Sequence, residues 1–89
     1  MRAADGKTEE LRAALEALIE PTSNEEGYVN YDLHQGVEDS RFFALYENWL
    51  SGEHVDNHLA APHLVDFASK MGELLDENGL TVNRVRRIG

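Results

Sequence analysis

The sequence predicts a single small domain of the α+β class, in which helices cover one face of an antiparallel sheet. Three patterns support this class: a helical periodicity from Leu11, an alternation of apolar and polar residues over 28–49, and a second helical pattern from Ser51. The chain has 89 residues, and so short a chain has too little apolar mass for two cores. We therefore expect residues 1–89 to form one domain.

The first predicted helix covers about residues 8–20. Its apolar residues recur with the period of one buried helix face. They are Leu11, Ala14, Leu15, Leu18 and Ile19. Pro21 is expected to end this helix, because proline has no amide hydrogen to continue the helical hydrogen bonds.

Two strands should follow and pair as an antiparallel hairpin. Residues 28–35 alternate, with Val29, Tyr31 and Leu33 on the apolar face. After a polar, glycine-containing turn, residues 41–49 are rich in aromatic side chains and again have the length of a strand.

The second strand carries large side chains on both faces. One face holds Phe43, Leu45, Glu47 and Trp49, and the other holds Phe42, Ala44, Tyr46 and Asn48. A sheet with one face in water would alternate more cleanly, so we expect a partner on the face of Phe42 and Tyr46.

The rest of the chain should form two helices and a strand. Ser51 is placed to cap a helix over about 52–60, Pro62 divides the pattern, and a longer helix should cover about 62–76. The apolar face of the longer helix comprises Leu64, Phe67, Ala68, Met71, Leu74 and Leu75. Residues 80–88 alternate again and predict a final strand.

Composition excludes several classes of partner. The formal net charge is −9, from 8 basic and 17 acidic residues, and the only basic cluster is Arg84, Arg86 and Arg87. We expect no nucleic-acid partner, since phosphate binding needs a basic face. The chain has no cysteine, which excludes disulfides and thiolate chemistry and suits a cytoplasmic protein. We expect no membrane partner either, because no stretch approaches the ~18–20 apolar residues of a membrane span.

Four short motifs together resemble the antibiotic biosynthesis monooxygenase family. They are Glu20-Pro-Thr22, Gly27 followed by Tyr31-Asp-Leu-His34, Tyr46-Glu-x-Trp49, and His58-Leu-Ala-x-Pro-His63. The resemblance covers about residues 5–88, and the last two motifs make it fairly specific.

The resemblance implies a fold, a reaction and an assembly. The fold would be ferredoxin-like, with helices on one face of the sheet and the partner of a homodimer on the other. The reaction would be a cofactor-independent monooxygenation, in which molecular oxygen oxidises a quinol or a polycyclic phenol-type substrate. The order of helix, strand, strand, helix and strand fits this fold with its first strand missing.

The missing strand is the main departure from the family. Family members begin with an apolar strand of which only Met1 remains here. That strand lies between two others in a ferredoxin-like sheet, so its loss would leave amides unpaired and part of the core open. We expect a truncated or misplaced start, or another chain that fills the gap, and favour a truncated start. Residues 1–4 should then be an edge remnant or poorly ordered.

Glu47 and His58 are the predicted catalytic residues. Glu47 is an acid on an otherwise apolar strand face, and a buried carboxylate needs a partner, for which His58 on the covering helix is the obvious candidate. His58 could then move a proton to or from a phenol, enol or hydroxyketone while Glu47 orients the ring. The alternative is a packing role for both residues. The predicted substrate-binding residues are Trp49, His63, Tyr31, Leu33 and Phe67.

Metals and cofactors are not expected. His54 and His58 are four residues apart and His63 follows, which would supply enough nitrogen ligands for zinc. Spacing alone is weak evidence, however, and Pro62 should turn His63 away. No glycine motif for a nucleotide occurs. The position that matches the iron-binding histidine of haem-degrading relatives falls near Ala68, which cannot ligate iron.

Two other functions stay open at this point. One is an isomerase of a small phosphorylated signalling sugar in the same family, which would need a phosphate site, with Arg41 or Arg84 as candidates. The other is a non-catalytic dimeric protein that binds a small molecule.

Overall fold

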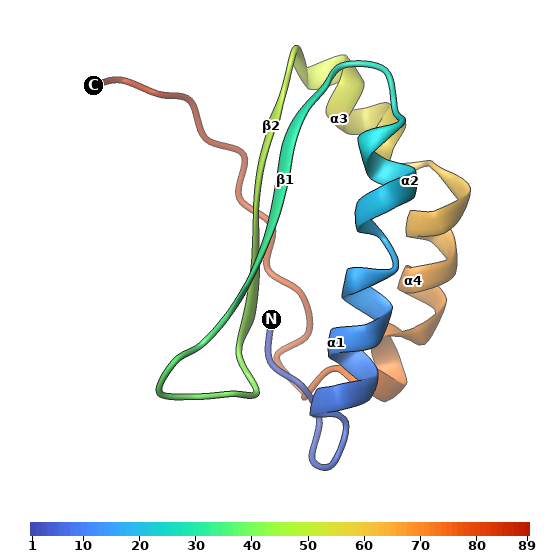
Figure 1. Cartoon of the computed structure of the whole chain (residues 1–89), viewed down its shortest axis with the longest axis vertical. Helices are drawn as coiled ribbons and strands as arrows, with labels where there is room; N and C mark the ends of the chain where they lie inside the picture. The colour runs from blue at the N-terminus through green and yellow to red at the C-terminus, as the bar shows by residue number, and fades with distance from the viewer.

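A computed structural model describes all 89 residues, and it places four helices on one side of an antiparallel hairpin (Figure 1). The hairpin consists of β1 (Tyr28–Gln35) and β2 (Phe43–Trp49), and Tyr31 of β1 lies opposite Glu47 of β2. The predicted hairpin and the α+β class are therefore confirmed.

The helices are α1 (Thr8–Glu16), α2 (Ile19–Ser23), α3 (Gly52–Leu59) and α4 (Pro62–Leu74). The prediction of one helix that ends at Pro21 is wrong, because the first helix breaks after Glu16 and Pro21 lies inside α2. Proline is tolerated there because the first turn of a helix has amides without intrahelical acceptors. No helix is long and apolar enough to cross a membrane.

The two faces of the hairpin differ in burial largely as predicted. Tyr31 and Phe43 face the helices and are buried, whereas Phe42 and Tyr46 on the opposite face are exposed. Val29 is an exception, since it was expected beside Tyr31 and is exposed. The pairing register shifts between Tyr28 and Asn30, and such an irregularity turns the extra residue away from the face of its neighbours.

The N-terminal residues pair with backbone on both sides. The amide of Phe43 donates to the carbonyl of Met1 at 2.9 Å, and the amide of Asp76 donates to the carbonyl of Arg2 at 2.9 Å. Residues 1–3 thus lie between β2 and the segment that follows α4, and Ala3 is fully buried. The expectation that residues 1–4 are an edge segment or poorly ordered is therefore wrong, because both sides of residues 1–3 carry backbone hydrogen bonds.

The core lies between the helices and the hairpin. It comprises Ala3, Leu11, Leu15, Leu18, Tyr31, Phe43, Phe67, Leu74 and Leu75. Ala68 was predicted on the buried face of α4 but is exposed. The buried stripe of α4 therefore follows Phe67 and Leu74 and is narrower than the sequence pattern suggested.

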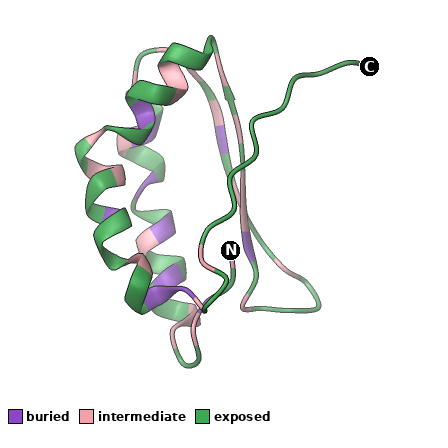
Figure 2. Ribbon diagram, turned by 180° about the vertical axis from the view of Figure 1, so that it is seen from behind, coloured by how far each residue is buried: buried purple, intermediate pink, exposed green.

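The predicted C-terminal strand does not form. Residues 80–88 have no helix or strand, and the chain leaves the body of the molecule as an exposed segment (Figures 1 and 2). Its apolar side chains, Leu80, Val82, Val85 and Ile88, are 41% to 95% exposed. Alternation alone does not make a strand, because a strand also needs backbone partners, and residues 80–88 make no backbone hydrogen bond or bridge to another segment.

Candidate functional site

A buried histidine on α3 is the centre of the candidate site. The side chain of His58 is 1% exposed and lies between α3 and the hairpin. The imidazole of His58 and the ring of Tyr31 pack edge to face, with their centroids 5.3 Å apart. The centroids of the His58 and Trp49 rings are 4.6 Å apart, and the two ring planes form an angle of 36°. Three residues expected at the site are therefore in contact, because two come from the inner face of the hairpin and one from the helix that covers it.

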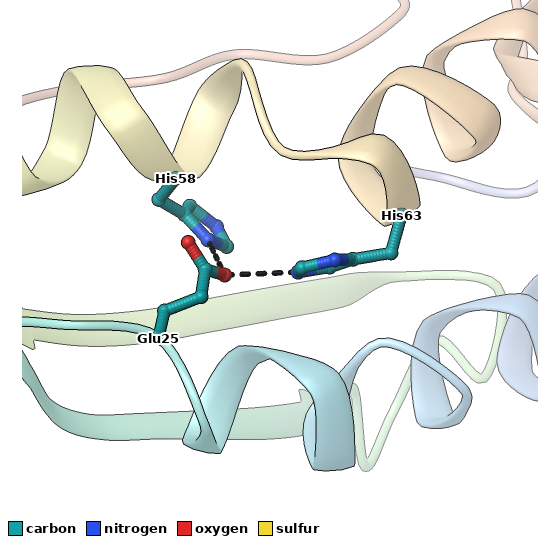
Figure 3. A group of neighbouring side chains, drawn as sticks. All are labelled: Glu25, His58 and His63. Carbon is teal, nitrogen blue, oxygen red and sulfur yellow. Dashed lines mark hydrogen bonds and ion pairs between the residues drawn. The ribbon is translucent and has the colours of Figure 1, made fainter.

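The carboxylate of Glu25 holds the imidazole of His58. Its Oε2 atom lies 2.6 Å from Nδ1 of His58, and the carboxylate is only 15% exposed (Figure 3). Glu25 lies in the turn between α2 and β1, which Gly27 closes with a positive φ of 82°. A side chain at Gly27 would collide with His54, so this position needs glycine for space as well as for conformation.

Sequence reasoning missed Glu25. Its neighbour Glu26 is also a glutamate, but its side chain is 94% exposed. The sequence pattern does not distinguish the two residues, because they are adjacent in the same polar loop. The nearest signal was Gly27 in the family motif, which marks a tight turn but does not say which acid points inward.

His63 reaches the same carboxylate oxygen as His58. Its Nε2 atom lies 2.9 Å from Oε2 of Glu25 and 3.3 Å from Oγ1 of Thr22, and the two imidazole centroids are 6.1 Å apart (Figure 3). The expectation that Pro62 turns His63 away is therefore wrong. Pro62 begins α4 after an extended Ala61, and this sharp connection brings the first turn of α4 beside the last turn of α3.

Glu47 lies on the other side of the imidazole of His58. Its Oε1 atom accepts a hydrogen bond from Nε1 of Trp49 at 3.0 Å and lies 3.7 Å from Nε2 of His58, which is beyond hydrogen-bond distance. The close contact that was expected from Glu47 is thus made by Glu25. Glu47 is 28% exposed and sits at the rim of the cluster.

The proton positions follow from these contacts. An ionised carboxylate only accepts hydrogen bonds, so Nδ1 of His58 and Nε2 of His63 donate to Glu25. A neutral His58 then has its lone pair on Nε2, on the side of Glu47. Burial raises the pKa of Tyr31, the carboxylates of Glu47 and Glu25 raise it further, and a hydrogen bond from Thr22 opposes this shift. The phenol of Tyr31 therefore stays protonated and uncharged at physiological pH.

The other two predicted substrate-binding residues belong to the packing around the site. Phe67 is buried in the core, and Leu33 is half-buried against it. Phe67 and His63 also line a pocket of about 110 Å³ between α1 and α4. Ligand pockets usually enclose about 300–1,000 Å³, so this pocket is too small for an aromatic substrate. A larger hollow of about 380 Å³ lies at the turn between the strands, around Val37 and Phe42, and contains neither histidine.

The side chains considered for a metal or a phosphate, those of His54, Arg41 and Arg84, make contacts outside the cluster. Nδ1 of His54 lies 2.8 Å from Oγ of Ser51, and its Nε2 faces Glu26, so His54 does not join the cluster. Arg41 donates to the carbonyl of Ala3 and pairs with Asp5. Arg84 pairs with Asp56 at 2.7 Å. Both guanidinium groups are thus engaged in other contacts, and neither belongs to the cluster of Glu25, His58 and His63.

The structure defines an α+β domain of the ferredoxin-like type, in which Glu25, the buried His58 and the partly buried His63 form a cluster between the hairpin and the helices. The chain belongs to the antibiotic biosynthesis monooxygenase family, whose model matches residues 1–70. The resemblance inferred from the four sequence motifs is thereby confirmed.

Relatives and solved structures agree with this family. A protein of Mycobacterium tuberculosis named "Putative monooxygenase Rv0793" is 38% identical over 65 residues, which cover 73% of this chain and 63% of that protein. YcnE of Bacillus subtilis, which carries the same designation, is 30% identical over 69 residues, 78% of this chain and 73% of YcnE. The crystal structure of PA3566 from Pseudomonas aeruginosa superposes with a TM-score of 0.91 at 31% identity, over 100% of this chain and 88% of that one. The match spans less than two thirds of the length of Rv0793, and none of these names specifies a substrate.

Proposed function

We propose that this chain is a cofactor-independent monooxygenase that oxidises a quinol or a polycyclic phenol-type substrate with molecular oxygen. The observation that carries the proposal is the buried His58, whose Nδ1 is held by Glu25 at 2.6 Å while Nε2 has no hydrogen-bond donor. A ring fixed in this tautomer is suited to accept a proton from a phenol at Nε2. The family and the names of its members support oxidation as the reaction class.

The proposed reaction balances without an added reductant. Nε2 of His58 takes a proton from a quinol hydroxyl, and the electron-rich anion reacts with oxygen at a ring carbon. One oxygen atom stays on that carbon and the other leaves as water, so that quinol and O₂ give a hydroxyquinone and H₂O. The substrate supplies all the electrons, and the protein supplies the base and a site that keeps water away from the anion.

The substrate would approach His58 from the side of Glu47. Glu47 and Trp49 are half-buried there, whereas His58 itself is closed off. The pocket of about 110 Å³ that His63 lines, on the side of α1 and α4, is too small for an aromatic ring. Binding beside Nε2 of His58 therefore requires Glu47 and Trp49 to move apart. Trp49 then offers a flat apolar surface for a ring.

We also propose that the protein is a homodimer. The outer face of the hairpin carries Phe42, 45% exposed, and Tyr46, 59% exposed. Covering such a face with a second copy removes apolar surface from water, which a small core needs. Around these side chains lie polar groups that can pair across an interface, namely Asn30, Asp32, His34 and Asn48.

An oxygen electrode tests the proposed function. The full chain, freed of metal with EDTA, should consume oxygen with reduced quinones or anthrone-like phenols, without added flavin or metal. His58→Asn should keep the fold and lower turnover by roughly 10²–10⁴, the usual contribution of a positioned proton-transfer group. His54→Asn, on the same helix but outside the cluster, is the matched control. Equal turnover of His58→Asn and the wild type, per folded molecule, would leave His58 with a packing role only.

A further inference from the structure

The cluster of Glu25, His58 and His63 has the composition of a metal site as well as that of a proton-transfer site. The three potential ligand atoms come from the turn before β1, from α3 and from the first turn of α4, and all lie within 4.8 Å of one another (Figure 3). We propose that this cluster binds a zinc ion through Nδ1 of His58, Nε2 of His63 and a carboxylate oxygen of Glu25.

The distances between the ligand atoms support this proposal. Zinc binds imidazole nitrogen at about 2.0–2.1 Å and carboxylate oxygen at about 2.0–2.2 Å, so neighbouring ligand atoms of a tetrahedral site lie about 3.3–3.5 Å apart. The two nitrogens are now 2.6 Å and 2.9 Å from Oε2 of Glu25. The two nitrogens lie within 4.8 Å of each other, so an ion could replace the two bridging hydrogen atoms if the carboxylate withdrew by less than about 1 Å and the imidazoles approached each other to about 3.4 Å between nitrogens. Two histidines and a glutamate also leave the fourth position open for water, as in catalytic zinc sites.

Glu47 gives an independent reason to favour a metal. A histidine that binds zinc usually donates its other ring N–H to a carboxylate, which fixes the tautomer of the ligand. When Nδ1 of His58 binds the ion, its proton moves to Nε2, and Oε1 of Glu47 already lies 3.7 Å from that atom. A movement of less than about 1 Å would complete this hydrogen bond. Of the two carboxylates beside His58, Glu25 would thus bind the zinc ion and Glu47 would accept the hydrogen bond of the ligating imidazole.

Access and charge also favour cation binding. Glu25 is 15% exposed and His63 is 21% exposed, so an ion can reach the cluster from the side of α4 although His58 is closed off. Two neutral imidazoles and one carboxylate suit zinc and its transition-metal neighbours better than magnesium or calcium, which prefer oxygen ligands.

The proposed zinc site does not depend on the proposed function. Bound zinc would, however, inhibit the proposed oxidation. With zinc on Nδ1 the imidazole of His58 carries its proton on Nε2, so it can no longer accept a proton from a phenol there. We therefore expect zinc to inhibit the oxidation. Binding is measured directly, so a protein that binds zinc and consumes no oxygen would overturn only the proposed function.

The first test is isothermal titration calorimetry of the untagged, EDTA-treated full chain with zinc chloride. We expect one zinc per chain, with no competition from excess magnesium. Loss of a residue that hydrogen-bonds to a zinc ligand weakens zinc binding by about 10–100-fold. His63→Asn removes a ligand itself, so it should weaken zinc binding by at least ~100-fold. His54→Asn and Glu26→Gln are controls, since they remove a histidine and a carboxylate that lie outside the cluster. Equal zinc affinity of His63→Asn and the wild type would overturn the site, as would an equal loss in His54→Asn.

A second measurement does not depend on the folding of a variant. Cobalt(II) added to the wild-type chain should give the intense visible absorption of a four-coordinate ion and should be displaced by one equivalent of zinc. A weak spectrum of six-coordinate cobalt, unchanged by zinc, would mean that ions bind only to surface carboxylates and would overturn the proposal. Glu47→Gln should keep the cobalt spectrum and bind zinc about 10–100-fold more weakly.

Discussion

Nδ1 of His58 lies 2.6 Å from Oε2 of Glu25, although 33 residues separate them in the chain. The same oxygen accepts from His63 at 2.9 Å, so one carboxylate connects the turn before β1 to the end of α3 and the start of α4. Hydrogen bonds to a charged, largely buried group are stronger than neutral ones. This carboxylate therefore both holds three elements together and fixes the tautomer of the proposed base.

The first prediction contrasts the two acids beside His58. Glu25→Gln should lower the free energy of unfolding by about 1–3 kcal/mol, because the amide loses the charge that the N–H groups of the buried His58 and the partly buried His63 share. Glu47→Gln should lower the free energy of unfolding by less than Glu25→Gln does. An amide oxygen can still accept the hydrogen bond of Trp49, and Glu47 makes no hydrogen bond to His58. Urea denaturation followed by circular dichroism measures both.

The control for this pair is Glu26→Gln. Glu26 is 94% exposed, so its variant should stay within about 0.5 kcal/mol of the wild type. An equal loss of stability in Glu25→Gln and Glu47→Gln would contradict the assignment of Glu25 as the main partner of His58.

The second prediction concerns alkaline pH. Because burial raises the pKa of Tyr31 above the usual value of about 10, the folded chain keeps this proton where the unfolded chain has released it. The contribution of Tyr31 to stability should be constant below about pH 10 and should fall as the pH rises further, by at most about 1.4 kcal/mol per pH unit. Tyr31→Phe should lose stability less steeply above about pH 10.

Denaturation midpoints between about pH 8 and pH 11 test this prediction. Tyr46→Phe, on the opposite face of the hairpin and measured at the same protein concentration, controls for the loss of a phenol outside the site. If the wild type and Tyr31→Phe lost stability in parallel, Tyr31 would not titrate differently in the folded and unfolded chains.

The third prediction concerns the C-terminal segment. Deletion of residues 80–89 should change the free energy of unfolding by no more than about 1 kcal/mol, since Arg84 with Asp56 is the only ion pair that it makes with the body and both side chains are more than half exposed. Thermal denaturation of the truncated and full chains measures this change. A loss of several degrees in melting temperature would mean that these residues pair as the strand that their alternation suggested.

The fourth prediction concerns the proposed dimer. Light scattering at micromolar concentration should give the mass of two chains, and Tyr46→Lys should shift it to that of one, because a charge would be buried at the centre of the outer face. Val65→Lys is the control, since Val65 is also exposed, at 57%, but lies on α4. A wild-type chain that scatters as a monomer would remove the dimer.

The comparison of Tyr31 with Val29 shows how far alternation could predict the sheet. Alternation places both residues on one face, and Tyr31 is buried as expected, but a register shift beside Val29 exposes it. Such irregularities depend on how the partner strand fits and are not visible in one strand's own sequence. The final strand is a second case, since residues 80–88 alternate but make no backbone hydrogen bond to another segment.

For this protein, local sequence determined the hairpin and the helix after Ser51, while the tertiary structure determined which side chains meet. The hairpin over 28–49 and the helix after Ser51 follow from periodicity and capping, which act over a few residues. The choice of Glu25 over Glu26 or Glu47 as the partner of His58 depends on how the turn before β1 packs against α3 and α4. Acids with the same chemistry differ here only in where the fold directs them, and that direction depends on contacts between residues far apart in the chain.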